Sequence, residues 1–144
     1  MQRKLYLGPL TDSRRWNSVD IRANDVIVAT PPKCGTTWMQ TIVALLLSGD
    51  PDTDPQLKER MPWVDIRVRE LADLAARLKA MPHRRGLKTH TPLDGLPVDD
   101  RATYLCVFRH PLDAHFSFRN HVRNMPVPWF EAWYPQDDQP RTFR

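Results

Sequence analysis

The stretch from Asp25 to Trp38, with the sequence DVIVATPPKCGTTW, constrains the fold more than any other part of the chain. Its apolar run, residues 26–29, is followed by two prolines, which cannot continue a central strand. Beyond the glycine that follows, apolar residues recur with helical spacing at positions 39, 42, 43 and 46. The pattern predicts a buried parallel strand, a tight loop and a helix.

The predicted loop carries groups that bind an anion. Lys33 and Gly35 precede the expected helix, and Thr36 and Thr37 begin it. Unpaired N–H groups and the helix dipole favour negative charge at a helix N-terminus. We therefore expect a phosphate-binding loop. It is not a Walker A loop, because the lysine of that motif follows the glycines.

The rest of the chain continues the alternation of strands and helices. A length of 144 residues is appropriate for one domain. Residues 1–24 are expected to be an irregular lead-in, and residues 50–62 a loop or short helix. The run over 103–108 has the composition of a strand covered on both faces. The expected fold is α/β, a parallel sheet with flanking helices. Helices are expected over about 36–48, 68–81 and 111–123, and strands over 26–29, 85–90 and 103–108.

Charge and histidine spacing limit the class of partner. The net charge is +4, but Lys and Arg are scattered without a long basic run. A small polyanion therefore fits better than a nucleic-acid surface. His110, His115 and His121 are not spaced to share one helix face as ligands, so a structural role is expected for them and no metal site is predicted.

Cysteine usage and hydropathy suggest a cytoplasmic protein. Cys34 and Cys106 form neither a disulfide framework nor a metal-binding pattern. A reducing compartment is the simplest expectation. The longest apolar run, residues 42–47, is too short to span a bilayer, and the first residues lack the apolar core of a signal peptide.

Three polar segments follow the predicted strands. They are residues 33–38, residues 88–90, and Arg109 with the helix behind it. Ligands of open parallel sheets bind at the carboxyl ends of the strands. We therefore expect the three segments to converge on one site.

The same segments carry a family resemblance. Residues 30–38 (TPPKCGTTW), 88–93 (KTHTPL) and 108–117 (FRHPLDAHFS) resemble the successive motifs of the soluble sulfotransferases. These enzymes use 3′-phosphoadenosine-5′-phosphosulfate (PAPS) as donor. Three motifs in order are a more specific signal than one. Residues 15–126 resemble the N-terminal half of bacterial members, which implies a P-loop-like sulfotransferase fold, here truncated to a single domain over residues 1–144 without the family's C-terminal half.

The resemblance implies roles for the residues of the first motif. Lys33, the amides from Gly35 onward, and the hydroxyls of Thr36 and Thr37 would hold the 5′-phosphate beside the sulfuryl group. Trp38 would stack on the adenine.

The resemblance also implies roles for the other two motifs. Arg109 and Ser117 would bind the 3′-phosphate of PAPS or of its product, 3′-phosphoadenosine-5′-phosphate (PAP). His90 would be the general base that takes the proton of an acceptor hydroxyl. Cys34, at a position where the family usually has serine, is expected to be a conservative replacement in the donor loop.

Structural roles compete with several of these assignments. Trp38 could pack in the core, and Thr36 could simply cap the helix, a role compatible with phosphate binding. His90 could be a structural turn residue. Arg109 could pair with an acidic side chain, and a serine inside a helix, such as Ser117, usually has no function.

The expected function is sulfuryl transfer from PAPS to a hydroxyl of a small, apolar or aromatic acceptor. A truncated, non-catalytic PAP- or PAPS-binding remnant is the main alternative, ahead of a P-loop kinase or NTPase and a nucleic-acid binder. Residues 126–144 resemble the start of the segment that covers the acceptor pocket. Their aromatic side chains could line that pocket, contact a partner subunit in a homodimer, or mark a broken edge; they are Trp129, Phe130, Trp133 and Tyr134.

Overall fold

The apolar run at residues 26–29 forms the central strand of the sheet. In a computed structural model of the chain, which describes residues 2–52, 54, 56–81 and 84–125, the sheet has three strands in the order β2-β1-β3. The strands are β1 (Val26–Ala29), β2 (Gly86–Thr89) and β3 (Thr103–Cys106). Both outer strands run parallel to β1, with Val26 opposite Gly86 on one side and Thr103 on the other. The predicted parallel α/β architecture is confirmed.

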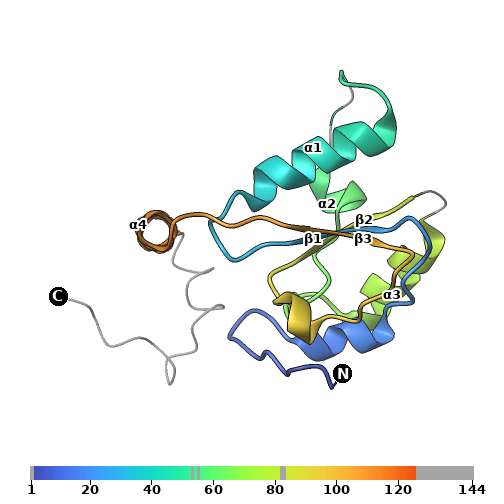
Figure 1. The fold of residues 1–144 in the computed structure, drawn as a ribbon, viewed down its shortest axis with the longest axis horizontal. Helices are drawn as coiled ribbons and strands as arrows, with labels where there is room; N and C mark the ends of the chain where they lie inside the picture. The colour runs from blue at the N-terminus through green and yellow to red at the C-terminus, as the bar shows by residue number, and fades with distance from the viewer. Residues whose placement is uncertain (1, 53, 55, 82–83, 126–144) are drawn as a thin grey trace.

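Alternation along β1 divides the core into two layers, because successive side chains of a strand point to opposite faces. Ile27 and Ala29 belong to a buried cluster that contains Trp16. Val26 and Val28 belong to a second cluster on the opposite face. Figure 1 shows helices on both faces of the sheet. The 3₁₀ helix η1 (Ser13–Ser18) and helix α3 (Leu71–Ala80) cover one face, and α1 (Thr36–Ser48) and α2 (Leu57–Arg60) cover the other.

Glycines set both ends of α1. Gly35 precedes the helix with φ of 91°, and Gly49 follows it with φ of 71°. Both values lie in the left-handed region, which glycine enters without a steric cost. The Gly49 N–H donates to the Leu45 carbonyl, a typical helix end. The helix therefore has the predicted bounds.

The first 80 residues depart from expectation in two places. Helix α3 begins at Leu71 and buries Leu74 and Leu78, whereas Val68, assigned to this helix from its spacing, lies before it and is 57% exposed. The expected irregular lead-in contains η1, and its Trp16 is 1% exposed in the core. An indole is large enough to anchor a short helix that has no periodicity of its own.

Strand β3 is less covered than predicted. Tyr104 and Leu105 are half-buried, and Thr103 and Cys106 are exposed. The expectation that both faces of this strand are covered is therefore wrong for the residues that the structure describes, where β3 is an edge strand. Before it, the chain passes through the 3₁₀ helix η2 (Leu93–Gly95).

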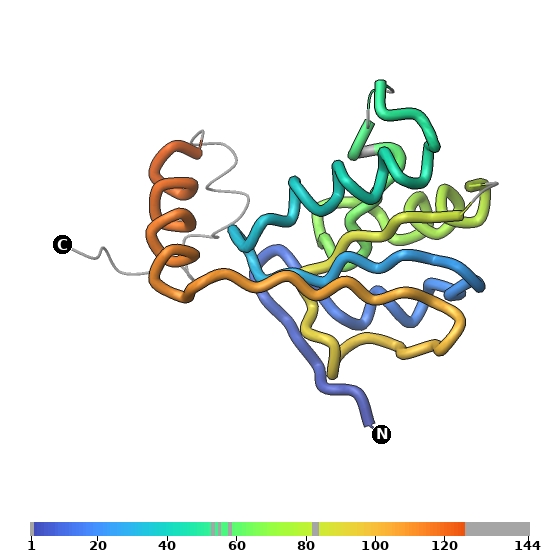
Figure 2. The backbone as a smooth tube through the Cα atoms, turned by 45° about the horizontal axis from the view of Figure 1, so that its top comes forward, coloured from blue at the N-terminus to red at the C-terminus, as the bar shows by residue number. Residues whose placement is uncertain are grey.

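Helix α4 (Pro111–Arg123) lies beyond the carboxyl ends of the strands, apart from the sheet (Figure 2). Its bounds agree with the prediction, and Pro111 occupies the first turn, where its missing N–H costs nothing. None of its residues is buried. The four aromatic residues expected beyond this helix, at positions 129, 130, 133 and 134, lie outside the described residues.

Candidate active site

A cavity of about 1050 Å³ lies at the carboxyl ends of the strands. The structure brings all three polar segments to it, together with an N-terminal segment, residues 6–11, that the sequence did not suggest. Backbone bridges from Leu7 to Asp12 and from Thr11 to Ile66 hold this segment in place. The predicted site residues that line the cavity are Lys33, Gly35, Thr36, Thr37, Trp38, His90, Arg109 and Ser117.

The loop before α1 holds Lys33 in an unusual backbone conformation. The Cys34 N–H donates to the Pro31 carbonyl and closes a tight turn, in which Lys33 has φ of 64°. A positive φ costs a residue with a Cβ about 1–2 kcal/mol relative to ordinary backbone. Cys34 is 5% exposed and is not among the lining residues, so the structure does not bring this predicted site residue to the cavity.

The first turn of α1 presents uncapped backbone amides. Gly35 occupies the N-cap position, and no side chain caps the helix. The Thr36 hydroxyl instead lies 2.5 Å from the Thr30 hydroxyl at the end of β1, so the alternative that Thr36 caps the helix is wrong. Because Gly35, Thr36 and Thr37 line the cavity, this helix end can bind an anion.

Trp38 is on the surface of the first turn of α1. It is 80% exposed and lines the cavity, so the core-packing alternative is wrong for the part of the chain that the structure describes. Its indole is accessible to a flat ring. Stacking on adenine remains a prediction.

Arg109 and Ser117 reach the cavity from the β3–α4 connection and from α4. Arg109 Nε lies 3.9 Å from Asp113 Oδ2, and both side chains are substantially exposed. An exposed pair at this distance contributes little, about 0–1 kcal/mol. The acidic partner foreseen for Arg109 is therefore present, but the guanidinium remains accessible. Ser117 is half-buried.

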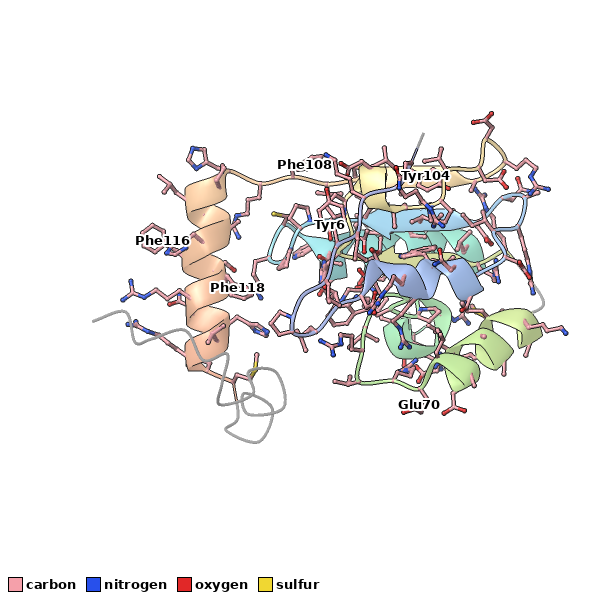
Figure 3. All side chains as sticks on the ribbon, turned by 90° about the horizontal axis from the view of Figure 1, so that it is seen from below. Tyr6, Glu70, Tyr104, Phe108, Phe116 and Phe118 are labelled. Atoms are coloured by element: carbon pink, nitrogen blue, oxygen red, sulfur yellow. The ribbon has the colours of Figure 1, made fainter. Side chains whose placement is uncertain are left out.

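Helix α4 adds His121 to the site, a residue for which the sequence indicated only a structural role. Figure 3 shows Phe116 and Phe118 on opposite sides of α4, with Phe118 toward the rest of the molecule. Phe118 and His121 line the cavity with Ser117. Burial and, to a lesser extent, the Lys33 ammonium lower the pKa of His121. His121 follows Ser117 by four residues, which places both on the same helix face. This spacing could have indicated from the sequence that His121 lies at the site.

His90 lies at the end of β2 with a defined tautomer. Its Nδ1 is 2.6 Å from the Thr30 carbonyl oxygen. A carbonyl only accepts, so Nδ1 carries the proton and Nε2 of the neutral ring has a free lone pair. The ring packs edge-on against Trp63, with centroids 4.9 Å apart. Burial, followed by the Lys88 charge, lowers the pKa of His90. The neutral ring that a proton acceptor requires is thus favoured.

Lys88 is a candidate functional residue that sequence reasoning named only as part of a motif. Its Nζ lies 3.8 Å from the centroid of the Trp63 ring, and the residue lines the cavity. Burial lowers the pKa of Lys88 to about 8, against a smaller opposing effect of Asp65. Residues two apart along an extended chain point to the same face. The spacing of Lys88 from His90 therefore indicated that Lys88 shares the face of the expected base.

The Lys88→Gln variant tests this depressed pKa. Unfolded Lys88 titrates near 10.5 and the folded residue near 8. Between these values the unfolded chain binds more protons, so the contribution of Lys88 to the free energy of unfolding rises with pH, by up to about 3 kcal/mol. We expect this rise in urea unfolding of the wild type and of the control Lys79→Gln, and its loss in Lys88→Gln. Parallel pH dependences for Lys88→Gln and the wild type would contradict the assignment.

Within residues 2–52, 54, 56–81 and 84–125, no group of three or more His, Cys, Asp or Glu side chains is placed to hold a metal ion. None of the helices described there combines the length and apolar character that crossing a bilayer requires.

A parallel sheet, an uncapped helix N-terminus and basic residues around one cavity are the features of an α/β domain that can bind an anion. The sequence matches the sulfotransferase domain family over residues 23–141. The chain belongs to this family, as its motifs predicted.

Curated relatives support the assignment. The chain is 42% identical over 123 residues to a glycolipid sulfotransferase of Mycobacterium tuberculosis, an alignment that covers 85% of this chain and 38% of the relative. It is 30% identical over 126 residues to sulfotransferase 6B1 of Mus musculus, covering 83% of this chain and 40% of that protein. The chain thus spans about two fifths of the length of these relatives.

Proposed function

We propose that this protein transfers a sulfuryl group from PAPS to a hydroxyl of a small apolar or aromatic acceptor. The observation that carries the proposal is the arrangement around one cavity of the Lys33 loop, the uncapped start of α1, and the neutral imidazole of His90. The first two suit a phosphate and the third suits a hydroxyl proton.

The cavity lining offers groups for each part of the donor. Lys33, the amides from Gly35 onward and the hydroxyls of Thr36 and Thr37 hold the 5′-phosphate in this proposal, and Trp38 stacks on adenine. Arg109 and Ser117 bind the 3′-phosphate, and Cys34 lies buried in the donor loop without lining the cavity. Its volume of about 1050 Å³ lies at the upper end of the range of small-molecule pockets.

The chemistry requires one proton acceptor and one cation. As the acceptor oxygen attacks the sulfur, its proton moves to His90 Nε2, and the bond from sulfur to the bridging oxygen of the 5′-phosphate breaks. PAP leaves with the bonding electron pair, and Lys33 stabilises the negative charge on its phosphate. By analogy with phosphoryl transfer, positioning and electrostatic stabilisation supply most of the catalysis.

Part of the cavity lining is apolar. This part includes Leu7, Leu10, Trp63, Leu93 and Phe118. The relative at 42% identity is named a glycolipid sulfotransferase, which supports an acceptor with an apolar part and a free hydroxyl.

The described cysteines are free thiols, as expected of the cytoplasm, where we place the protein.

Arg109→Ala tests the 3′-phosphate assignment. Loss of a charge-assisted contact of about 1.5–3 kcal/mol should weaken PAP binding about 10- to 100-fold. AMP lacks the 3′-phosphate, so its dissociation constant should change little. Isothermal titration of both ligands checks this, with Arg119→Ala, elsewhere on α4, as control. Equal losses of PAP and AMP affinity would refute the assignment.

A further inference from the structure

A buried carboxylate outside the predicted site contacts the segment that carries His90. Asp65, in the loop between α2 and α3, is 0% exposed. Its Oδ2 accepts from two side chains, Thr89 Oγ1 at 2.9 Å and Thr91 Oγ1 at 2.7 Å. It also accepts from two backbone amides, His90 N at 3.1 Å and Thr91 N at 2.9 Å. All of these donors belong to three consecutive residues centred on His90.

Such a cluster has a clear energetic consequence. A buried carboxylate is costly unless hydrogen bonds replace its lost water. Here every hydrogen bond to the carboxylate goes to Oδ2 and comes from residues 89–91 at the end of β2, whereas Oδ1 is buried without a partner among the described residues. Moving this segment would therefore leave the whole carboxylate unpaired. The Asp65 carboxylate therefore fixes the path of the chain where it leaves β2, which is where the direction of the His90 side chain is set.

Asp65 is itself held firmly. Its carbonyl accepts from Asp12 N at 2.8 Å, and the neighbouring Val64 N donates to the Lys88 carbonyl at 3.0 Å. Arg15 Nε donates to the Val64 carbonyl at 3.1 Å. The loop is thus bonded both to the N-terminal segment and to β2, so Asp65 can act as a fixed reference for the His90 backbone.

The ring of His90 is fixed by two other groups. The Thr30 carbonyl holds Nδ1, and Trp63 packs against the ring. The two charges that act on the ring are opposed, since Lys88 lowers the pKa of His90 and Asp65 raises it. Asp65 thus acts both on the backbone of His90 and on its electrostatic environment.

We propose that Asp65 is the positioning residue of the general base, holding the segment from Thr89 to Thr91 so that Nδ1 of His90 meets the Thr30 carbonyl and Nε2 stays available to the acceptor hydroxyl. The description of His90 as a general base rests on the proposed function. The geometric part, that Asp65 sets the tautomer and orientation of His90, is independent of it.

The test compares Asp65→Asn with the wild type and with Asp73→Asn, an exposed carboxylate on α3. By analogy with groups that orient a metal ligand, we expect kcat for sulfuryl transfer to fall about 10- to 100-fold, with the KM for PAPS changed less than about twofold. In ¹⁵N NMR spectra of the histidine rings, His90 should lose its uniform Nδ1–H tautomer. Its titration should move to lower pH, because the carboxylate that raises its pKa is gone.

A milder variant covers the case in which Asp65→Asn does not fold. Thr91→Val removes one of the bonds to Asp65 and keeps the charge, so we expect a fall in kcat of about 2- to 10-fold. The His90 ring signals should change while their titration stays near the wild-type position. Unchanged kcat and unchanged ring signals in a folded Asp65→Asn, or in Thr91→Val where Asp65→Asn does not fold, would overturn the proposal.

Failure of the proposed function is recognised separately. A wild-type protein that binds no PAP and transfers no sulfuryl group would refute the activity, whereas the tautomer and titration of His90 would still decide whether Asp65 positions this ring.

Discussion

Replacing Lys33 with alanine is expected to lower kcat for sulfuryl transfer about 10²- to 10³-fold, because a well-placed donor to developing charge contributes about 3–4 kcal/mol. Lys33 is half-buried in the loop before α1 and belongs to neither core cluster. The variant should therefore fold. The assay is steady-state transfer from PAPS, with Lys79→Ala on the exposed face of α3 as control.

A second substitution at this position separates function from structure. Lys33 has φ of 64°, which glycine adopts without strain. Lys33→Gly should therefore unfold with a free energy about 1 kcal/mol higher than that of Lys33→Ala, yet be equally inactive. Retention of most activity by either variant would remove Lys33 from the mechanism. If Lys33→Gly is more stable than Lys33→Ala but no more active, the role of Lys33 is catalytic and not structural.

Replacing His90 with alanine is expected to lower kcat about 10²- to 10⁴-fold, the usual contribution of a positioned general base. The pH profile provides the sharper evidence. His90 must be neutral to accept a proton, so activity falls as pH drops through its pKa. Because burial and Lys88 lower that pKa from 6.5, the wild type should stay active below pH 6.5.

The residual activity of His90→Ala should lack this acidic fall. His115→Ala, an exposed histidine of α4 that does not line the cavity, is the control and should keep the wild-type profile. An unchanged acidic limb in His90→Ala would assign the titration to another group, and His121 would then be examined first.

The strand, loop and helix around Lys33 could be predicted because every local signal agrees there. The apolar run is short, two prolines end it, and Gly35 and Gly49 mark the two ends of the helix. The three polar segments could be predicted to meet because all follow parallel strands. Helix α3 was placed less well, because Val68 has the right spacing yet lies before the first turn.

What could not be predicted depends on contacts distant in sequence. Asp65 is one acidic residue among many in the sequence, and its role follows only from its contacts with residues 24 to 26 positions away. The partner of Thr36 proved to be Thr30 rather than the helix backbone. The burial of Trp16 and the N-terminal wall of the cavity likewise depend on tertiary packing, which carries no local pattern.

The most direct test of the central claim is the thermal stability of the 144-residue chain with PAP and, separately, with AMP. A ligand that binds only the folded state stabilises it by about 2.7 kcal/mol at a concentration of 100 times its Kd. We predict a melting temperature that rises with PAP concentration, and a much smaller rise with AMP at equal concentrations. A cooperative transition that PAP does not move, or that PAP and AMP move equally, would contradict the assignment of this cavity as a 3′-phosphoadenosine site.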